Sequence, residues 1–449
     1  MGALRVAIVG SGPAGFYAAG ALLAADLPVE VDMIERLPTP WGLVRLGVAP
    51  DHPKIKSVSR AFEKIASQPG FRFLGNVEVG VAVQHAELLE LYDAVVYAVG
   101  AQTDRRMGIP GEDLPGSWAA TEFVAWYNGH PDFQHLEFDL SAERAVVIGN
   151  GNVAVDVARM LALTPGELAP TDTTDAAIEA FTHARIREIV MVGRRGPAQA
   201  AFTNPELQEL GELAGADVIV RADELALDPA SEAAPEHDTN ARRNLDVLRE
   251  YAARVPAGKP KRLVLRFLMS PVEITGDGRV EGIELVRNRL EADERGPLRA
   301  VATGERETLP TGAVFRSVGY RGVSLPGVPF DEGSGTISND RGRVSPGVYV
   351  AGWIKRGPTG VIGTNKKDAT ETVELLLEDL REAPRKGAAA EDVEALLLER
   401  GVRLVVYAGW ISIDEVERGA GEKLGRPRVK LCTWDELLSA AEQVASETG

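Results

Sequence analysis

The sequence predicts an α/β protein built on two parallel sheets, and three observations lead to this prediction. Two glycine-rich turns, at residues 10–15 and 149–154, each lie between a nearly continuous apolar run and a helical segment. Continuous apolar runs are typical of strands in a parallel sheet whose two faces are covered by helices. Two later apolar runs, at residues 314–318 and 347–351, also end beside a glycine. The chain therefore contains two copies of one strand–turn–helix unit.

The elements follow from these patterns in chain order. The first half is predicted to contain strands at residues 4–9, 29–35 and 92–99, helices at 16–25 and 55–67, and a proline-rich loop at 36–53. The second copy is predicted to contain strands at 145–148 and 188–192, a helix at 155–163 and a loop at 164–175. The remaining segments are predicted as an acidic surface loop at 229–238, antiparallel strands at 264–268, 280–286 and 298–301, a helix at 369–380, a linker at 382–390 and a small α/β tail with a strand at 403–407.

The composition excludes several classes of protein. The chain has 49 lysines and arginines against 66 aspartates and glutamates, a net charge of −17, whereas a general nucleic-acid binder needs a broad basic surface. Hydrophobic residues make up 45% of the chain, which is enough for packed cores. The single cysteine, Cys432, excludes an internal disulfide, a CxxC redox pair and a multi-cysteine metal site. No histidines show paired ligand spacing, so we expect no metal site.

One segment resembles a membrane span in length, because residues 6–25 carry no charge. Gly10, Gly12, Pro13 and Gly15 interrupt it, and a strand followed by a buried helix accounts for it better than a span or a signal sequence. We therefore expect no membrane insertion and a cytoplasmic location.

The first glycine run, Gly10-Ser-Gly12-Pro-Ala-Gly15, has the spacing of a dinucleotide-binding turn. Its glycines allow a tight turn, approach of a pyrophosphate to the backbone, and close packing of helix and strand. The phosphates then meet free amides at the positive end of the helix. Glu35 ends the next strand, where a carboxylate accepts hydrogen bonds from ribose hydroxyls.

The second glycine run, Gly149-Asn-Gly151-Asn-Val-Ala154, is followed by a strand that ends in two basic residues, Arg194 and Arg195. A carboxylate here would repel a 2′-phosphate, whereas two guanidinium groups bind it through charge-assisted hydrogen bonds. The pair favours NADP over NAD. The alternative is an ordinary surface pair of arginines. An unphosphorylated and a phosphorylated ribose site in one chain predict a bound flavin dinucleotide that accepts hydride from NADPH.

Five further segments carry a resemblance to a known family. They are the loop at residues 39–53 (TPWGLVRLGVAPDHP), residues 147–159 (VIGNGNVAVDVAR), 192–197 (VGRRGP), 202–207 (FTNPEL) and 352–365 (GWIKRGPTGVIGTN). Together they closely resemble the adrenodoxin-reductase type of ferredoxin–NADP(+) reductase, in the same order and over essentially the whole chain. The resemblance implies two Rossmann-like (glutathione-reductase-like) domains, with an NADP domain at residues 106–317 inserted in an FAD domain at 1–105 and 318–449.

The resemblance also implies site residues. Contacts to FAD are expected from the first turn (Gly10, Gly12, Ala14, Gly15) and from Glu35, Leu43, Val79, Trp353, Gly360, Val361 and Ile362. Contacts to NADP are expected from Asn150, Gly151, Asn152, Val153, Arg194, Arg195, Glu206 and Gly360.

Hydride transfer needs positioning of two rings rather than a general base. His52 and Glu206 lie in family motifs that approach the nicotinamide, and Asp156 ranks third; they are the candidate catalytic residues. The expected role of His52 is to orient the nicotinamide. A helix expected near Asn365 would place its amino end toward the flavin edge that gains negative charge.

The family implies an iron–sulfur partner, a ferredoxin or adrenodoxin-like protein, that accepts electrons one at a time. Docking to an acidic partner needs a local basic surface, for which the candidates are Arg242, Arg243, Lys259, Lys261, Arg262, Lys355 and Arg356. Two alternatives remain from the sequence: an NADPH-oxidising flavoprotein that serves a different acceptor, and a nucleotide-binding module without turnover.

Overall fold

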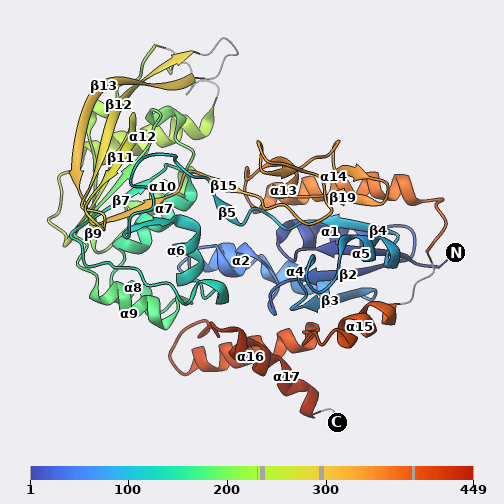
Figure 1. Ribbon diagram of the computed structural model, residues 1–449. Helices are drawn as coiled ribbons and strands as arrows, with labels where there is room; N and C mark the ends of the chain where they lie inside the picture. The colour runs from blue at the N-terminus through green and yellow to red at the C-terminus, as the bar shows by residue number, and fades with distance from the viewer. Residues whose placement is uncertain (1, 230, 233–237, 293–297, 387–389, 448–449) are drawn as a thin grey trace. The chain divides into compact units, whose positions relative to one another are not determined.

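The protein is described by a computed structural model covering residues 2–229, 231–232, 238–292, 298–386 and 390–447 (Figure 1). The chain divides into two compact units. Unit 1 contains Met1–Thr103, Asn128–Gln134 and Gly319–Gly449, and unit 2 contains Asp104–Tyr127 and His135–Val318. Unit 1 is therefore assembled from three stretches of the chain, separated by the two stretches that form unit 2.

Unit 1 is built on a six-stranded sheet of order β18-β19-β4-β1-β2-β3. Its strands are β1 (Leu4–Val9), β2 (Val29–Glu35), β3 (Phe71–Gly75), β4 (Ala94–Tyr97), β18 (Arg343–Ser345) and β19 (Val348–Val350), with short strands β15 (Tyr320–Arg321), β16 (Phe330–Asp331) and β17 (Thr336–Ile337) outside it. Its helices are α1 (Pro13–Leu23), α2 (Leu43–Leu46), α3 (Pro53–Lys56), α4 (Ser59–Ala66), α5 (His85–Leu91), η1 (Pro131–Phe133), α13 (Trp353–Arg356), α14 (Ile362–Leu380), α15 (Ala390–Glu399), α16 (Tyr407–Glu422) and α17 (Trp434–Glu447).

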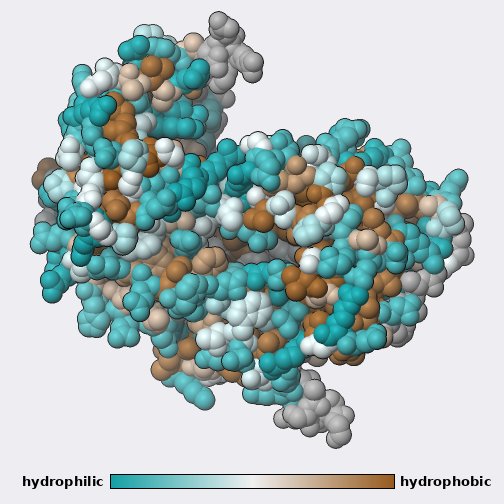
Figure 2. Space-filling view, in the orientation of Figure 1, coloured by the Kyte–Doolittle hydropathy of each residue, from teal (hydrophilic) through white to brown (hydrophobic). Residues whose placement is uncertain are grey.

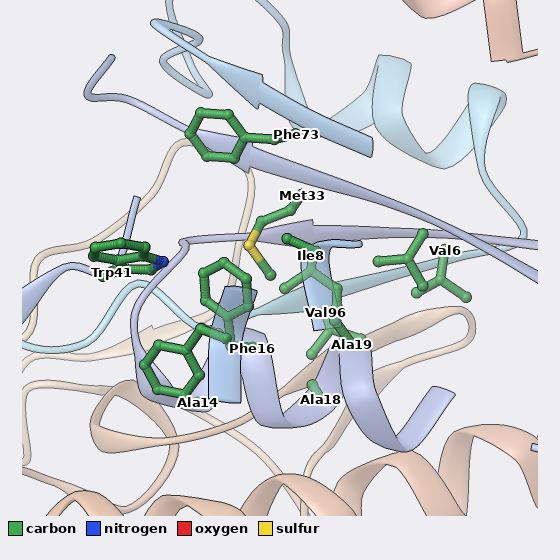
Figure 3. Packing of buried hydrophobic residues seen from close by; sticks show 14 of the residues in the cluster. Val6, Ile8, Ala14, Phe16, Ala18, Ala19, Met33, Trp41, Phe73 and Val96 are labelled. Carbon is green, nitrogen blue, oxygen red and sulfur yellow. The ribbon is translucent and has the colours of Figure 1, made fainter. Parts of the chain in front are cut away.

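The five strands from β3 to β19 run parallel, and only β18 is antiparallel. The central strand β1 is buried along its whole length, because α1 and α14 pack together on one face and α5 lies on the other (Figure 1). Figure 3 shows the first of these interfaces, where Phe16 of α1 lies beside Ile8 of β1 and Met33 of β2. Phe16 also stacks on Phe62 of α4, with ring centroids 4.9 Å apart. Such burial explains why the strands read as unbroken apolar runs.

Unit 2 is built on a second six-stranded sheet of order β6-β14-β7-β8-β10-β9. Its strands are β6 (Ser117–Ala119), β7 (Arg144–Ile148), β8 (Glu188–Val192), β9 (Ala216–Val220), β10 (Lys261–Arg266) and β14 (Ala313–Arg316), and all of them run parallel. Its helices are α6 (Ala120–Tyr127), α7 (Asn152–Ala162), α8 (Pro165–Leu168), α9 (Asp175–His183), η2 (Pro197–Gln199), α10 (Asn204–Leu210), η3 (Ala222–Leu225) and α12 (Thr239–Ala253). Strand β5 (Thr103–Asp104) leads into this unit.

A three-stranded antiparallel sheet is also part of unit 2, made of β11 (Met269–Thr275), β12 (Gly282–Ala292) and β13 (Leu298–Pro310). The antiparallel annex is present, but the assignment of residues 264–268 to it is wrong. Those residues belong largely to β10, which pairs in parallel with β8 and β9. The annex strand that the sequence analysis missed is β11. Most of the acidic loop expected at 229–238, residues 230 and 233–237, lies outside the described residues.

The C-terminal tail, residues 390–447, is helical and not α/β as expected. It consists of α15, α16 and α17. In place of the strand expected at 403–407, Val405 forms an isolated antiparallel bridge with Gly75, and Tyr407 begins α16. The apolar residues of this segment are explained by packing, since Val405 and Trp410 are buried in the unit 1 core.

Hydrophilic residues cover most of the surface visible in Figure 2, with smaller apolar areas between them. Within the described ranges, no helix has both the length and the apolar character needed to cross a membrane. The uncharged run at residues 6–25 is divided between β1, the first glycine turn and α1.

One carboxyl group in unit 2 makes stability depend on pH. Burial raises the pKa of Asp104 to about 6, although the backbone N–H of Thr121 donates a hydrogen bond to its Oδ2 at 3.3 Å. The folded protein holds this proton more tightly than the unfolded chain does. The stability that Asp104 contributes is therefore fully present below the unfolded pKa and is lost as the pH rises through 6.

We therefore expect Asp104→Asn, which keeps the acceptor but removes the charge, to raise the midpoint of thermal unfolding by about 4 °C at pH 8. At pH 4 the midpoint should hardly change. The measurement is thermal unfolding followed by circular dichroism at both pH values, with exposed Asp277→Asn as the control. An equal gain at both pH values would contradict the assignment.

Candidate functional site

The first glycine turn connects the end of β1 to the start of α1. Gly10 has a φ of 104°, and a Cβ on it would lie 2.6 Å from the carbonyl oxygen of Ala98 at the end of β4. A Cβ on Gly15 would collide with the carbonyl oxygen of Gly10. At Gly12 the space around an added Cβ is open to 4 Å. Two glycines thus fix the turn, and the third leaves its backbone open to a ligand such as a pyrophosphate.

Glu35, at the end of β2, binds this turn. Its Oε2 accepts hydrogen bonds from the backbone N–H and the hydroxyl of Ser11, at 3.0 and 2.7 Å. Its Oε1 accepts from the backbone N–H of Leu37 at 3.0 Å. Each carboxylate oxygen has more than one lone pair, so Glu35 fixes the turn and can still accept hydrogen bonds from ribose hydroxyls.

The second glycine turn repeats this arrangement in unit 2. Gly149, at the end of β7, has a φ of 140°, and a Cβ on it would collide with the carbonyl oxygen of Ser317 just after β14. Around Gly151 the space is again open to 4 Å. Asn152 begins α7, and its Oδ1 accepts a hydrogen bond from the backbone N–H of Thr203 at 2.8 Å. The Nδ2 of Asn150 is buried without a hydrogen-bond partner in the described part of the chain.

Arg194 and Arg195 follow β8, the strand that corresponds to β2 of unit 1. Arg194 is exposed and Arg195 is half-buried, and within the described residues neither makes an ion pair. Burial, with a smaller contribution from Arg194, lowers the pKa of the Arg195 guanidinium. The Nδ2 of Asn288 fixes the peptide between Arg194 and Arg195 by donating a hydrogen bond to the carbonyl of Arg194 at 2.8 Å. Two adjacent cations without a counter-ion are suited to a phosphate monoester.

The third segment of interest runs from Gly352 to α14. Gly352 has a φ of 80°, lies against Ala14 of α1, and donates its N–H to Asp368 at 2.5 Å. Trp353 begins α13, and its Nε1 is buried without a partner among the described atoms. Gly360 has a φ of 80°, and a Cβ there would lie 2.6 Å from the Thr364 hydroxyl, so both the backbone and the local space favour glycine. Gly360, an expected contact of both FAD and NADP, thus also has a structural reason to be glycine.

Helix α14 begins at Ile362, three residues earlier than the expected start near Asn365. Ile362 is half-buried and Val361 is 56% exposed. The amino end of this 19-residue helix therefore lies directly after Gly360 rather than a turn later.

The other two residues assigned to FAD by resemblance lie in loops of unit 1. Leu43 is the first residue of α2 and is 37% exposed. Val79 is buried and forms a single bridge with Val83.

The candidate catalytic residues occupy different units. His52, in unit 1, is 7% exposed and lies immediately before α3. Glu206, in unit 2, is 8% exposed in the first turn of α10, and Asp156 lies on α7, which packs against α10. The Oδ1 of Asp156 accepts a hydrogen bond from the Arg159 guanidinium at 2.8 Å. Asp156 thus has a structural partner on its own helix, which agrees with its place as the third of the three candidate catalytic residues.

Comparisons with known proteins agree with this geometry. Residues 4–191 match the family model described as pyridine nucleotide-disulphide oxidoreductase. The chain is 56% identical to NADPH-ferredoxin reductase FprA of Mycobacterium tuberculosis, over 96% of this chain and 98% of that protein. It is 41% identical to the mitochondrial NADPH:adrenodoxin oxidoreductase of Arabidopsis thaliana, over 98% and 95%. The structure of M. tuberculosis FprA in complex with NADPH superposes with a TM-score of 0.94, at 55% identity, covering 98% of this chain and 100% of that one.

The chain belongs to the ferredoxin–NADP(+) reductase family of the adrenodoxin-reductase type. The predicted resemblance and the predicted α/β fold with two Rossmann-like domains are confirmed. The reductase is accordingly an oxidoreductase.

The structure adds residues that sequence reasoning missed. Ser11 links the first turn to Glu35, and Asp368 binds Gly352, Lys355 and Arg356 at once. Ser11 lies inside the glycine motif and could have been found there. Asp368 is one of many acidic residues on a helix, and no local pattern marks it.

The structure also separates the candidate docking residues. Lys355 and Arg356 are largely buried in ion pairs with Asp368, both at 3.1 Å. Burial lowers the pKa of Lys261, whose Nζ donates to the carbonyl of Leu161 at 2.7 Å. The charged groups of Lys259 and Arg262 are bound to the carbonyl of Leu213 and to Glu188. Only Arg242 and Arg243, on α12, are exposed and make no ion pair in the ranges that the structure describes.

The two glycines of the first turn give a matched pair of variants. We expect Gly12→Ala to fold normally but to lose bound FAD, because its Cβ enters only the open space above the turn. Gly15→Ala should unfold several degrees lower, because its Cβ collides with backbone. The readouts are the flavin-to-protein absorbance ratio and thermal unfolding, with Gly419→Ala in α16, where a Cβ is also unobstructed, as the control. Full FAD occupancy in Gly12→Ala would refute this role of the turn.

Proposed function

We propose that the reductase oxidises NADPH by transferring hydride to a bound FAD, and then passes the two electrons one at a time to a ferredoxin-like iron–sulfur protein. Unit 1 binds FAD and unit 2 binds NADPH. The observation that carries the proposal is the difference between two otherwise equivalent turns: Glu35 ends the strand beside the first, and Arg194 and Arg195 follow the strand beside the second. The names of the relatives, an NADPH-ferredoxin reductase and an NADPH:adrenodoxin oxidoreductase, support it.

The residues of unit 1 fit FAD. The open space at Gly12 and the free amides at the start of α1 suit a pyrophosphate, and Glu35 has the lone pairs that ribose hydroxyls need. The buried, unpartnered Nε1 of Trp353 offers a donor in the segment that begins beside Ala14. FAD supplies the chemistry, because a flavin accepts two electrons as hydride and can release them singly.

In the proposed mechanism, the protein positions the nicotinamide and stabilises the negative charge that the flavin gains. The guanidiniums of Arg194 and Arg195 bind the 2′-phosphate and so select NADPH. The positive φ of Gly360 directs the chain into α14, whose amino end carries the partial positive charge that stabilises added negative charge on the flavin. His52 and Glu206 orient the nicotinamide, and no general base is required.

Cofactor preference tests the arginine pair. Replacing both Arg194 and Arg195 by leucine should raise the KM for NADPH by about 100-fold, because each lost charge-assisted hydrogen bond costs about 1.5–3 kcal/mol. Activity with NADH should stay near that of the unsubstituted reductase. Ferricyanide reduction measures both, and exposed Arg185→Leu is the control. Equal losses with NADPH and NADH would show that the pair has no role in recognising the phosphate.

The proposed role of His52 predicts a kinetic defect with the cofactor in place. His52→Ala should slow flavin reduction by NADPH about tenfold or more, since small displacements of reacting groups reduce rates strongly. FAD content should not change. Anaerobic stopped-flow absorbance follows the reaction, with exposed His135→Ala as the control. An unchanged rate would make His52 a scaffold residue.

Partner docking predicts a defect that depends on the acceptor. Charge reversal of Arg242 and Arg243 to glutamate should slow ferredoxin-dependent cytochrome c reduction about tenfold at low salt, and less at high salt. Direct reduction of ferricyanide should be unaffected. Reversal of Arg289 and Arg299, exposed on β12 and β13, makes the same change in net charge and is the control. Equal slowing with both acceptors, or no ferredoxin stimulation of the unsubstituted reductase, would count against this partner.

A further inference from the structure

The C-terminal tail of unit 1 contains a carboxyl group that is completely buried. Glu417 of α16 has an exposed side-chain fraction of 0%. Its two oxygens accept hydrogen bonds from both terminal nitrogens of Arg45, at 2.8 and 2.5 Å. They also accept from the Arg428 guanidinium at 3.0 Å and from the backbone N–H of Leu431 at 2.9 Å. Burial, the largest single effect, raises the pKa of Glu417, but Arg45, Arg428 and the Leu431 amide together bring the pKa below its usual range.

Arg45 is 372 residues away in sequence and belongs to the loop that follows β2. It lies on α2, and its guanidinium is stacked over the Trp410 ring, 5.3 Å from the centroid. The same tryptophan packs edge-on against Trp41, with ring centroids 4.9 Å apart. Residues 41–46 are thus bound to α16 at both ends.

This segment in turn lies against the first glycine turn. The backbone N–H of Trp41 donates to the carbonyl of Ser11 at 3.0 Å. A Cβ on Gly42 would lie 3.1 Å from the Cα of Gly12, so the two backbones are in direct contact. Trp41 has a φ of 84°, a conformation that a residue with a large side chain rarely adopts in a free loop. External contacts must therefore hold the segment in place.

A second attachment lies at the other end of the loop. Arg36, next to Glu35, forms an ion pair with Asp132 at 2.7 Å. Trp434 of the tail donates its Nε1 to the same carboxylate at 2.9 Å. The tail therefore contacts the loop through Arg36 as well as Arg45.

From this geometry we propose that Glu417 is a positioning residue for the dinucleotide turn of unit 1: through Arg45 it holds residues 41–46 against Gly12, and it thereby sets the affinity for FAD. The inference rests on the proposed function in naming FAD as the ligand. Glu417 would act on FAD binding indirectly, because it contacts the loop that contains Arg45 and not the glycine turn itself. The contact between Glu417 and Arg45 restricts the backbone beside Gly12 before the ligand arrives. Less conformational entropy is then lost when the ligand binds.

The test compares Glu417→Gln, which keeps the volume but removes the charge, with two controls on the same helix. Glu415→Gln changes an exposed carboxylate. Ser412→Ala removes a buried hydroxyl that donates to the carbonyl of Ala440 at 2.7 Å, and so weakens the contact between α16 and α17 without touching the loop. FAD affinity is measured by quenching of flavin fluorescence on the FAD-free protein, together with thermal unfolding.

We expect Glu417→Gln to weaken FAD binding about tenfold or more, and both controls to stay within about twofold. Arg45→Met should have a similar effect, and the double variant should be no worse than either single variant, because the two residues act as one pair. If Glu417→Gln does not fold, Arg45→Lys, which keeps the charge but not the two-pronged contact, serves in its place. Unchanged affinity, or an equal loss in Ser412→Ala, would overturn the inference.

Amide hydrogen exchange separates this inference from the proposed function. Without FAD, the peptide spanning residues 41–48 should exchange faster in Glu417→Gln than in either control. Equal exchange would overturn the positioning role even if FAD affinity fell. Failure of the unsubstituted protein to bind FAD would overturn the proposed function, while the exchange rates would still decide whether Glu417 holds the segment.

Discussion

The site in each unit depends on one constraint, the close approach of backbones where a central parallel strand ends. In unit 1 the N–H of Gly10 donates to Ile34 at the end of β2, while Ala98 donates to Val9 at 2.8 Å. In unit 2 the N–H of Gly149 donates to Val192 at the end of β8, while Ser317 donates to Ile148. Each turn is therefore bound to the strands on both sides, and no side chain fits at its first glycine. The result is a rigid turn with an open backbone at the amino end of a helix.

Identical scaffolds leave chemical selectivity to a few side chains. Glu35 is held by two hydrogen bonds from Ser11 of the turn and one from the backbone of Leu37, so its orientation is fixed before a ligand arrives. Arg194 and Arg195 lack such partners in the described structure, and their mutual repulsion is left for an anion to relieve. One acidic residue and two basic residues thus occupy equivalent places at the strand ends of the two units, and the proposed selection between two nucleotides rests on this difference.

Local patterns in the sequence predicted the features that depend on neighbouring residues alone. The glycine turns, their flanking strands and the residues at the strand ends follow from periodicity and backbone sterics, and these were predicted correctly. Residues 264–268 and 403–407 were assigned wrongly, because an apolar run does not reveal whether its partner is a parallel strand, an antiparallel strand or a helical core. The contacts of Asp368 with Gly352 and of Glu417 with Arg45 join residues that are distant in sequence, and single-sequence patterns contain no information about them.

The interrupted course of unit 1 has a consequence for how the chain is made. Strand β4 ends at Tyr97, but its neighbour β19 begins at Val348, about 250 residues later. Helix α14, which covers α1, follows later still. At typical rates of synthesis the ribosome needs roughly 12–50 s to produce that interval. During this time unit 2 can complete its own sheet, whereas the first hundred residues wait with an uncovered strand edge and an exposed helix face. All the strands of the unit 2 sheet are therefore made before the last strands of the unit 1 sheet, and the early segment is exposed to wrong strand pairing until the C-terminal part of the chain has been made.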